Sequence, residues 1–225
     1  MYFHRCQALV EAAEAAHAEL TQQAQDPSGV IRGSLPVDFA VDRITVIIAE
    51  FIRLYPRITF DLDLSPRQSD LIAEPVDFVV RIGRPSEGGL IQRKLTEVSI
   101  GLFASPDYIA EHGLPLHPQD LQQHNVLSIL GRPLRFLADV PETRPNSPVL
   151  VNNVSWLRRF ALAGMGIAAL SSDMARPEVV RSALLPILPD WHLPKVEVYV
   201  LTESRLLPAR VRLFLDYLIA NLDAA

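Results

Sequence analysis

Strand-like and helix-like segments alternate along this chain after residue 33, and this alternation restricts the possible folds more than any other feature. Residues 35–41 have the composition of a strand, residues 44–54 have the apolar spacing of a helix, and residues 58–64 alternate apolar and polar side chains. A short helix over 67–73 and a nearly continuous apolar strand over 76–82 follow. This order predicts a parallel sheet with right-handed crossovers and helices on both faces.

The second half of the chain repeats the pattern. Ser105-Pro106-Asp107 supplies an N-cap and a first-turn proline for a helix that Gly113 ends. The other predicted strands and helices cover 98–104, 126–130, 149–151, 155–163, 166–170, 196–201 and 209–222, with an irregular, proline-rich stretch over 131–148. Because the strands over 98–104 and 196–201 lie where one half would pass to the other, the sequence predicts an α/β protein of two lobes with a hinged cleft.

The N-terminal segment has the properties of a long amphipathic helix. Residues 2–25 contain no glycine or proline and are rich in Ala, Glu, Gln and Leu. Asp26-Pro27-Ser28-Gly29 then ends the helix. One interpretation is a helix that packs on its own domain; we favour a dimerisation helix, because small residues along a heptad seam allow a partner helix to approach closely. The seam consists of Cys6, Leu9, Ala13, Ala16 and Leu20.

The composition limits the partners and the compartment. Lys and Arg number 21 and Asp and Glu number 26, so the net charge is −5. A domain that binds the phosphate backbone of nucleic acid by itself usually has more basic than acidic residues, so we do not expect this chain to bind DNA alone. A single cysteine, Cys6, is typical of a reducing compartment, and no apolar run is long enough to cross a bilayer. We therefore expect a cytoplasmic protein.

Motifs for catalysis, cofactors or metals are absent from the sequence. It has no P-loop, no nucleophile elbow, no His-Glu-x-x-His and no Cys-x-x-Cys. The Gly164-Met165-Gly166 run follows a predicted helix and precedes a strand, which favours a tight turn over a nucleotide site. The three histidines between 112 and 124 favour solvated side chains, and the Asp61 and Asp63 pair favours a solvent-facing strand. We expect a protein that is not an enzyme and holds no cofactor or metal.

The candidate binding residues follow from the predicted sheet. Ligands of open α/β sheets bind beyond the carboxyl ends of the strands, near helix N-termini. Four such places carry polar side chains, and ordinary capping or turn chemistry is the alternative at each. Trp156 is the most suggestive, because a ring beside free N–H donors suits an aromatic or aliphatic carboxylate. The candidates are Asp42, Arg43, Thr45, Arg81, Ser128, Asn153, Ser155 and Trp156.

A series of short motifs runs in a fixed order over nearly the whole chain. The motifs are Phe3-His4-Arg5-Cys6, Glu50-Phe51, Tyr55-Pro56, Asp77-Phe78-Val79-Val80-Arg81-Ile82-Gly83, Ala104-Ser105-Pro106-Asp107-Tyr108, Ala161-Leu162-Ala163-Gly164-Met165-Gly166-Ile167, Leu188-Pro189-Asp190-Trp191 and Leu207-Pro208-Ala209-Arg210-Val211-Arg212-Leu213-Phe214. As an ordered set they resemble the linker helix and effector-binding region of LysR-type transcriptional regulators, and the first of them is similar to the start of that linker helix.

The resemblance implies two Rossmann-like lobes of periplasmic-binding-protein type II architecture, joined by two crossover strands and preceded by the linker helix. The expected divisions are residues 1–29 for the dimerisation helix, 30–104 plus 202–225 for the first lobe, and 105–201 for the second. It also implies a homodimer or tetramer, a small-molecule effector in the cleft, and control of transcription. A stand-alone binding protein or an enzyme on the same fold is the alternative.

Two departures from the family affect these expectations. The family's N-terminal helix-turn-helix is absent, so DNA contact would be made by a domain missing from this chain. The segment over 33–50 looks shorter than the family's first strand and loop, which leaves Asp42 or Thr45 in place of the usual hydroxyl residue. An acidic Asp42 disfavours an anionic effector at that position. The resemblance places the effector contacts near Val41, Asp42, Arg43, Arg81, Ser128, Asn153, Ser155 and Trp156.

Overall fold

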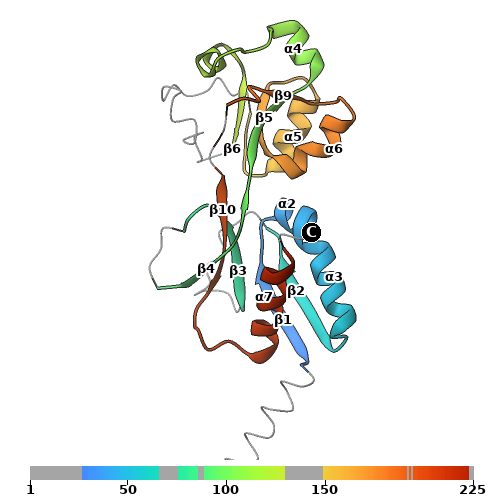
Figure 1. Ribbon diagram of the computed structural model, residues 1–225, viewed down its shortest axis with the longest axis vertical. Helices are drawn as coiled ribbons and strands as arrows, with labels where there is room; N and C mark the ends of the chain where they lie inside the picture. Colours follow the sequence, from blue (N-terminus) through green and yellow to red (C-terminus); the bar gives the residue numbers. More distant parts are fainter. Residues whose placement is uncertain are drawn as a thin grey trace, which may run out of the picture.

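The computed structural model describes residues 27–65, 76–85, 89–129, 149–191, 193 and 195–222, and they form two α/β lobes one above the other (Figure 1). The first sheet has the order β2 (Ile58–Asp63), β1 (Gly29–Ser34), β3 (Phe78–Ile82), β10 (Val196–Thr202) and β4 (Ile91–Val98). The second has the order β7 (Leu150–Val151), β6 (Val126–Ile129), β8 (Ile167–Ser171), β5 (Ile100–Ala104) and β9 (Leu185–Ile187). The two-lobed α/β prediction is therefore confirmed.

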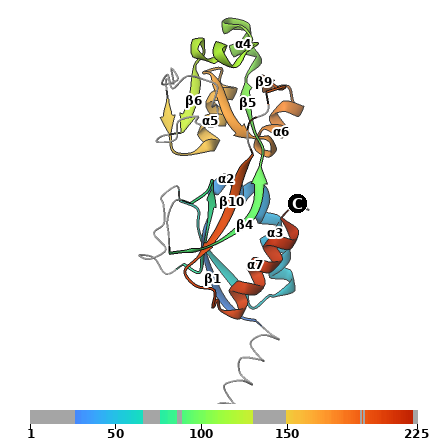
Figure 2. The same ribbon diagram turned by 60° about the vertical axis from the view of Figure 1, so that its left-hand side comes forward.

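The sheets are mixed rather than wholly parallel. β1 pairs in parallel with β2 and β3, as the strand and helix order predicted. β10 returns antiparallel between β3 and β4, and β5 runs antiparallel to β8 and β9. The chain thus crosses from the first sheet to the second at Ser99, between β4 and β5, and returns between β9 and β10. Figure 2 shows these crossings as the connection between the lobes.

Sheet membership differs from the expected lobe division at both crossings. The predicted strand over 98–104 is split by Ser99, so that Val98 ends β4 and Ile100 begins β5 in the other sheet. The predicted strand over 196–201 is β10, which lies in the first sheet and not in the second lobe. We use first lobe for β1–β4, β10 and their helices, and second lobe for β5–β9 and theirs.

The prediction of a strand over 35–41 is wrong, because the first strand lies upstream and those residues begin a helical segment. β1 ends at Ser34, and α2 (Val37–Phe39), the π-helix η1 (Ala40–Ile44) and α3 (Thr45–Leu54) then follow without a break. The buried side chains of Phe39, Ile44, Ile47 and Phe51 share one helical face, which a strand could not provide. Because β1 lies upstream, the reason for regarding the segment over 33–50 as shorter than the family's first strand and loop no longer holds.

The first lobe packs α3 and α7 (Ala209–Asn221) side by side against its sheet (Figure 1). Phe214 is fully buried at the centre, with its ring centroid 5.2 Å from that of Phe51, 4.8 Å from Phe60 and 5.6 Å from Phe78. Gly33 on β1 lies against the Phe78 ring, where any side chain would collide. The tilted and edge-on ring geometry adds stabilisation beyond the apolar area that is buried.

The second lobe has a core on each face of its sheet, as alternation along a strand requires. Phe103 on β5 faces α5 (Val154–Leu162) and α6 (Ser172–Val180), while its neighbours Leu102 and Ala104 face the other side. That other side is covered by α4 (Pro106–His112) and the 3₁₀ turn η2 (Pro118–Gln123). The predicted helix over 67–73 and the predicted irregular stretch over 131–148 lie outside the described residues.

Candidate functional site

The start of α5 in the second lobe meets the start of α2 in the first lobe. Asn153 caps α5, because its Oδ1 atom accepts a hydrogen bond of 3.3 Å from the Trp156 backbone N–H. Ser155, in the first turn of that helix, donates its hydroxyl hydrogen to the carboxylate of Asp38 in the first turn of α2. One side-chain hydrogen bond therefore joins the N-terminal turns of two helices across the lobes.

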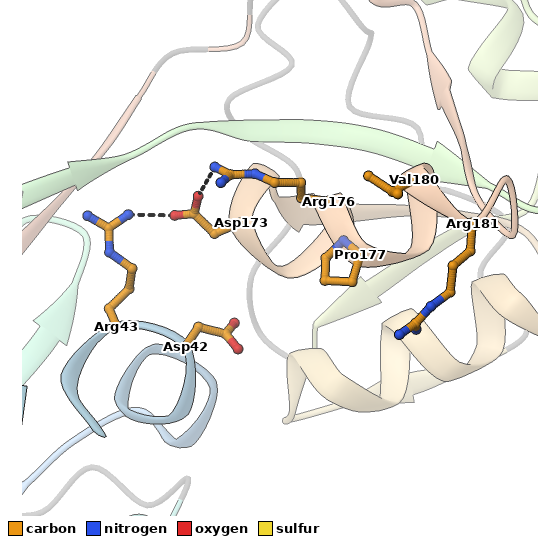
Figure 3. Close-up of a pocket in the computed structure, with 7 residues that line it drawn as sticks. All are labelled: Asp42, Arg43, Asp173, Arg176, Pro177, Val180 and Arg181. Carbon is orange, nitrogen blue, oxygen red and sulfur yellow. Dashed lines mark hydrogen bonds and ion pairs between the residues drawn. The ribbon is translucent and has the colours of Figure 1, made fainter. Parts of the chain in front are cut away.

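A second contact between the lobes is made by Arg43 on η1. Its Nη1 atom donates to Oδ2 of Asp173 at 2.6 Å, and its Nη2 atom donates to the backbone carbonyl of Leu222 at 2.9 Å. Asp173 lies in the first turn of α6, where Ser171 is the N-cap. Arg176 also binds Asp173, with 2.8 Å between Nη2 and Oδ1. Figure 3 shows Asp173 held between the two guanidinium groups.

A cavity of about 710 Å³ adjoins this ion pair. Figure 3 shows η1 on one side of it and α6 on the other, so the cavity lies between the lobes. Its lining residues are Asp42, Arg43, Asp173, Arg176, Pro177, Val180 and Arg181. The volume lies in the range of natural small-molecule sites, which occur preferentially at domain interfaces.

Acidic groups concentrate on the first-lobe side of the interface. The pKa of Asp42 is raised above its ordinary value, first by burial and then by repulsion from Asp38 and Asp173, against the attraction of Arg158. Asp38 and Asp42 are four residues apart on one helical segment, and Arg158 and Asp173 come from the second lobe. The pKa of Asp42 therefore depends on which charged groups of the second lobe face it.

Two guanidinium groups at this interface retain unused donors. Within the described ranges, the Nε atoms of Arg43 and Arg158 are buried side-chain nitrogens without a hydrogen-bond partner. Arg158 reaches Glu178 with its Nη1 atom at 3.5 Å, so its charge is compensated although its Nε donor is free. Buried donors of this kind are costly unless water or a ligand satisfies them.

The structure brings together three of the predicted site residues: Asp42, Arg43 and Ser155. Asn153 is the cap of α5, the helix that carries Ser155. Val41 and Trp156 are about 60% exposed, at 60% and 59%. The Thr45 hydroxyl donates to the carbonyl of Ala40 within its own helical segment.

The other predicted positions lie on strands. Arg81 is on β3, with Nη1 donating to the Val80 carbonyl, and Ser128 is on β6, where it pairs with Leu150 of β7. The dimerisation residues Cys6, Leu9, Ala13, Ala16 and Leu20 lie outside the described residues.

Asp38 and Asp173 are site residues that the sequence reasoning missed. The false strand over 35–41 hid Asp38, whose spacing of four from Asp42 places both on one side of a helix. Asp173 follows the carboxyl end of β8 and begins α6, a helix that was not predicted. The rule applied to the other strands, that ligands bind beyond their carboxyl ends, would have pointed to Asp173 had α6 been recognised.

The histidines and the aspartate pair have local structural partners. The His112 ring stacks on Tyr108 with 4.4 Å between centroids, and the Tyr108 hydroxyl lies 3.2 Å from Nδ1 of His124. Asp61 pairs with Arg32 at 3.6 Å on the surface, and Asp63 accepts hydrogen bonds from Ser65. Among the described residues, no group of His, Cys, Asp and Glu is arranged to hold a metal, and no helix is long and apolar enough to span a membrane.

The chain matches the family described as the LysR substrate binding domain over residues 24–223. An HTH-type transcriptional regulator of Xanthomonas campestris is 31% identical over 99% of this chain and 68% of its own length. The HTH-type transcriptional regulator PtxR of Pseudomonas aeruginosa is 33% identical, over 86% of this chain and 64% of its own length. The chain thus spans about two thirds of these two relatives.

Solved structures give the same result. CrgA, a LysR-type transcriptional regulator from Neisseria meningitidis, superimposes with a TM-score of 0.77 at 26% identity, covering 98% of this chain and 78% of CrgA. The Vibrio cholerae virulence activator AphB superimposes with a TM-score of 0.74 at 26% identity, covering 96% of this chain and 77% of AphB. A match over 24–223 together with these relatives shows that the chain belongs to the LysR family of transcriptional regulators and carries its substrate-binding domain.

Proposed function

We propose that this chain is the sensing region of a LysR-type regulator, and that its effector binds between the lobes where α2 and α5 begin. The contact between Ser155 and Asp38 is the observation that supports this position most directly. It is a polar link between two helix N-terminal turns from different lobes, so a ligand that replaces it would contact both lobes at once. Such a ligand can favour one lobe orientation over another, which is the requirement for a switch.

The two walls of this position differ in charge, and we propose an effector that matches both. The first lobe presents the carboxyl groups of Asp38 and Asp42. The second lobe presents the N-terminal turn of α5, the exposed ring of Trp156 and the guanidinium of Arg158. A carboxylate suits the second wall, while a hydroxyl or amine donor suits the first. A small hydroxy- or amino-substituted carboxylate, aromatic or aliphatic, satisfies both.

The assembly proposed for the whole regulator follows its relatives. The two relatives are HTH-type transcriptional regulators, so we propose that effector binding in this domain modulates DNA binding by a helix-turn-helix outside this chain, in the cytoplasm. We propose a homodimer or tetramer that uses the seam of the N-terminal segment. The seam residues Cys6, Leu9, Ala13, Ala16 and Leu20 remain the candidates for that contact.

A ligand screen tests the proposal. The melting temperature would be measured with benzoate, 4-hydroxybenzoate, an aliphatic hydroxy acid, an amino acid and a neutral aromatic alcohol. A ligand at 100 times its dissociation constant stabilises the native state by about 2.7 kcal/mol. Ser155→Ala should remove most of the shift for a true effector, whereas Thr59→Ala, an exposed hydroxyl deletion on β2, should keep it.

The outcomes separate sensing from other activities. A stabilising carboxylate that is recovered unchanged after incubation supports a sensor. A shift that is equal in Ser155→Ala and in the unaltered protein would place the ligand elsewhere. A well-folded protein that no panel member stabilises would contradict the proposed effector class.

A further inference from the structure

Arg43 connects three separate parts of the fold through one side chain. It is carried by η1, the π-helical segment between α2 and α3, and its side chain is 18% exposed. One end of its guanidinium binds Asp173 in the second lobe, and the other binds the Leu222 carbonyl, just after the end of α7 in the first lobe. In the sequence, Asp173 is 130 residues and Leu222 is 179 residues from Arg43.

The electrostatics of both helix ends favour this arrangement. The last carbonyls of a helix have no partner within the helix and carry partial negative charge, so a guanidinium at Leu222 is stabilising there. Asp173 lies at the N-terminus of α6, where a negative charge is stabilising. The guanidinium therefore sits between the negative end of α7 and the negative residue at the start of α6.

The polar contacts between the lobes lie on one side of the first lobe. Apart from the two crossings, the lobes are joined by the side-chain hydrogen bonds of Ser155 to Asp38 and of Arg43 to Asp173. Both first-lobe partners lie on the continuous helical segment that begins with α2. Beside the Arg43 contact lies the cavity of about 710 Å³, which leaves room for the lobes to rotate.

We propose that the Arg43–Asp173 ion pair sets the angle between the lobes, and that Arg43 is the positioning residue of the hinge. The inference concerns the regulation of the proposed effector cleft and rests on that function for its biological meaning. The angle itself can be measured in the protein without an added ligand. Arg176 continues to neutralise Asp173 when Arg43 is removed, so the second lobe keeps its fold while the lobes become free to rotate.

Spin labels on the two lobes test this in the protein without ligand. Cys6 is the single cysteine, so a Cys6→Ser background accepts labels at Glu111→Cys on α4 and Arg212→Cys on α7, both exposed positions. Dilution with unlabelled protein removes distances between copies. Pulsed electron resonance then gives the distribution of distances between the lobes. Circular dichroism confirms that each variant is folded.

The variants separate an angle-setting role from a merely stabilising one. Arg43→Gln and Asp173→Asn should both broaden and shift the distance distribution. Arg43→Lys should restore a narrow distribution, because the ammonium can still reach Asp173. The matched control is Arg93→Gln, which removes the exposed 2.8 Å ion pair with Asp216 inside the first lobe. It should leave the distribution unchanged.

The contrary result is equally clear. If Arg43→Gln and Asp173→Asn fold and keep the narrow distribution, the crossing strands alone set the angle and the inference is wrong. If Arg43→Gln fails to fold, Asp173→Asn answers the same question from the second lobe. A ligand screen without hits would contradict the proposed effector and leave this measurement unaffected, so the two failures are distinguishable.

Discussion

Asp42 is an acidic residue whose ionisation opposes folding. Its pKa is raised above 3.8 by burial, by Asp38 and by Asp173. A carboxyl whose pKa is higher in the native state than in the unfolded chain binds more protons when folded. Stability is therefore highest below pH 3.8 as far as this group is concerned, and is lost as pH rises through the native pKa.

Asp42→Asn should accordingly raise the melting temperature at pH 7, because it removes a penalised charge. The gain should shrink as pH falls toward the ordinary aspartate pKa. Glu203→Gln, at an exposed position, is the control and should have little effect at either pH. Melts of the three proteins at pH 7 and at about pH 4 make the comparison. A lower melting temperature for Asp42→Asn at pH 7 would show that Asp42 has a stabilising partner.

The contribution of His124 to stability depends on pH in the opposite direction to that of Asp42. It is 7% exposed, and its pKa is lowered by burial and by His112, against Asp120. The Tyr108 hydroxyl accepts from the Asn125 backbone N–H at 2.9 Å and is 3.2 Å from Nδ1 of His124. The hydroxyl hydrogen is then available for a neutral imidazole. Because a base with a lowered native pKa binds fewer protons when folded, stability falls as pH drops below 6.5.

His124→Asn keeps an acceptor for Tyr108 but cannot be protonated. Its melting temperature should change less than that of the unaltered protein between pH 6.5 and about pH 5. Gln122→Asn, a substitution without a titratable group at an exposed position of η2, should keep the original pH dependence. If His124→Asn loses stability on acidification as steeply as the unaltered protein, another group controls it.

Elements that depend on local sequence were predicted well. α4 was predicted from Ser105, Pro106 and Gly113, and the structure shows Ser105 Oγ accepting the Tyr108 N–H at 3.2 Å, with Gly113 at a φ of 83°. Strands that form because a strand distant in the sequence pairs with them were not predicted well. β4 exposes Gln92, Arg93 and Lys94 and is a strand because β10 pairs with it. The position of β1 depends on β2 and β3 in the same way.

The turn at Gly164-Met165-Gly166 is the predicted link from helix to strand, between α5 and β8. A side chain at Gly166 would collide with the Asn125 carbonyl oxygen. Gly166→Ala should therefore destabilise the protein by about 1–3 kcal/mol or more, as overpacking does. Gly113→Ala faces open space and carries only the strain of its backbone, φ 83° and ψ 164°, about 1–3 kcal/mol, so Gly166→Ala, which adds a collision to its own positive φ, should lose more. Urea unfolding would compare them; equal losses would mean that β8 moves away from Asn125 readily.

At the scale of the whole molecule, the candidate site is the part that the sequence predicted least completely. Ser155 was found because it lies in the first turn of a predicted helix, whereas Asp42 and Arg43 were found from the position after the predicted strand over 35–41, which the structure replaces with a helical segment. Their partners Asp173 and Asp38 lie 130 and 117 positions away along the chain, and local patterns carry no information on such pairings. The two-lobed form was predictable because it follows from the order of elements.

The few contacts between the lobes predict separable unfolding. Both tryptophans, Trp156 and Trp191, lie in the second lobe, so tryptophan fluorescence reports on that lobe and circular dichroism on both. Phe214→Ala should cost about 3–5 kcal/mol in the first lobe. The dichroism melt should then acquire an early phase while the fluorescence midpoint stays in place.

The reciprocal variant Leu127→Ala, in the core of the second lobe, should lower the fluorescence midpoint instead. If fluorescence and dichroism shift together in Phe214→Ala, the lobes unfold as one cooperative unit, and the contacts between them are stronger than the two hydrogen bonds indicate.

The return of the chain to the first sheet has a consequence for biosynthesis. The second lobe is one continuous stretch, whereas the first is completed by β10, which lies between β3 and β4 in the sheet, and by α7. During translation, the second lobe can therefore fold while the first lobe still lacks β10, the strand that lies between β3 and β4. Until translation delivers β10, the edges of β3 and β4 that it covers have no partner in their own chain. Such open edges are where nascent chains associate wrongly, so we expect this protein to depend on protection by chaperones during the last part of its synthesis.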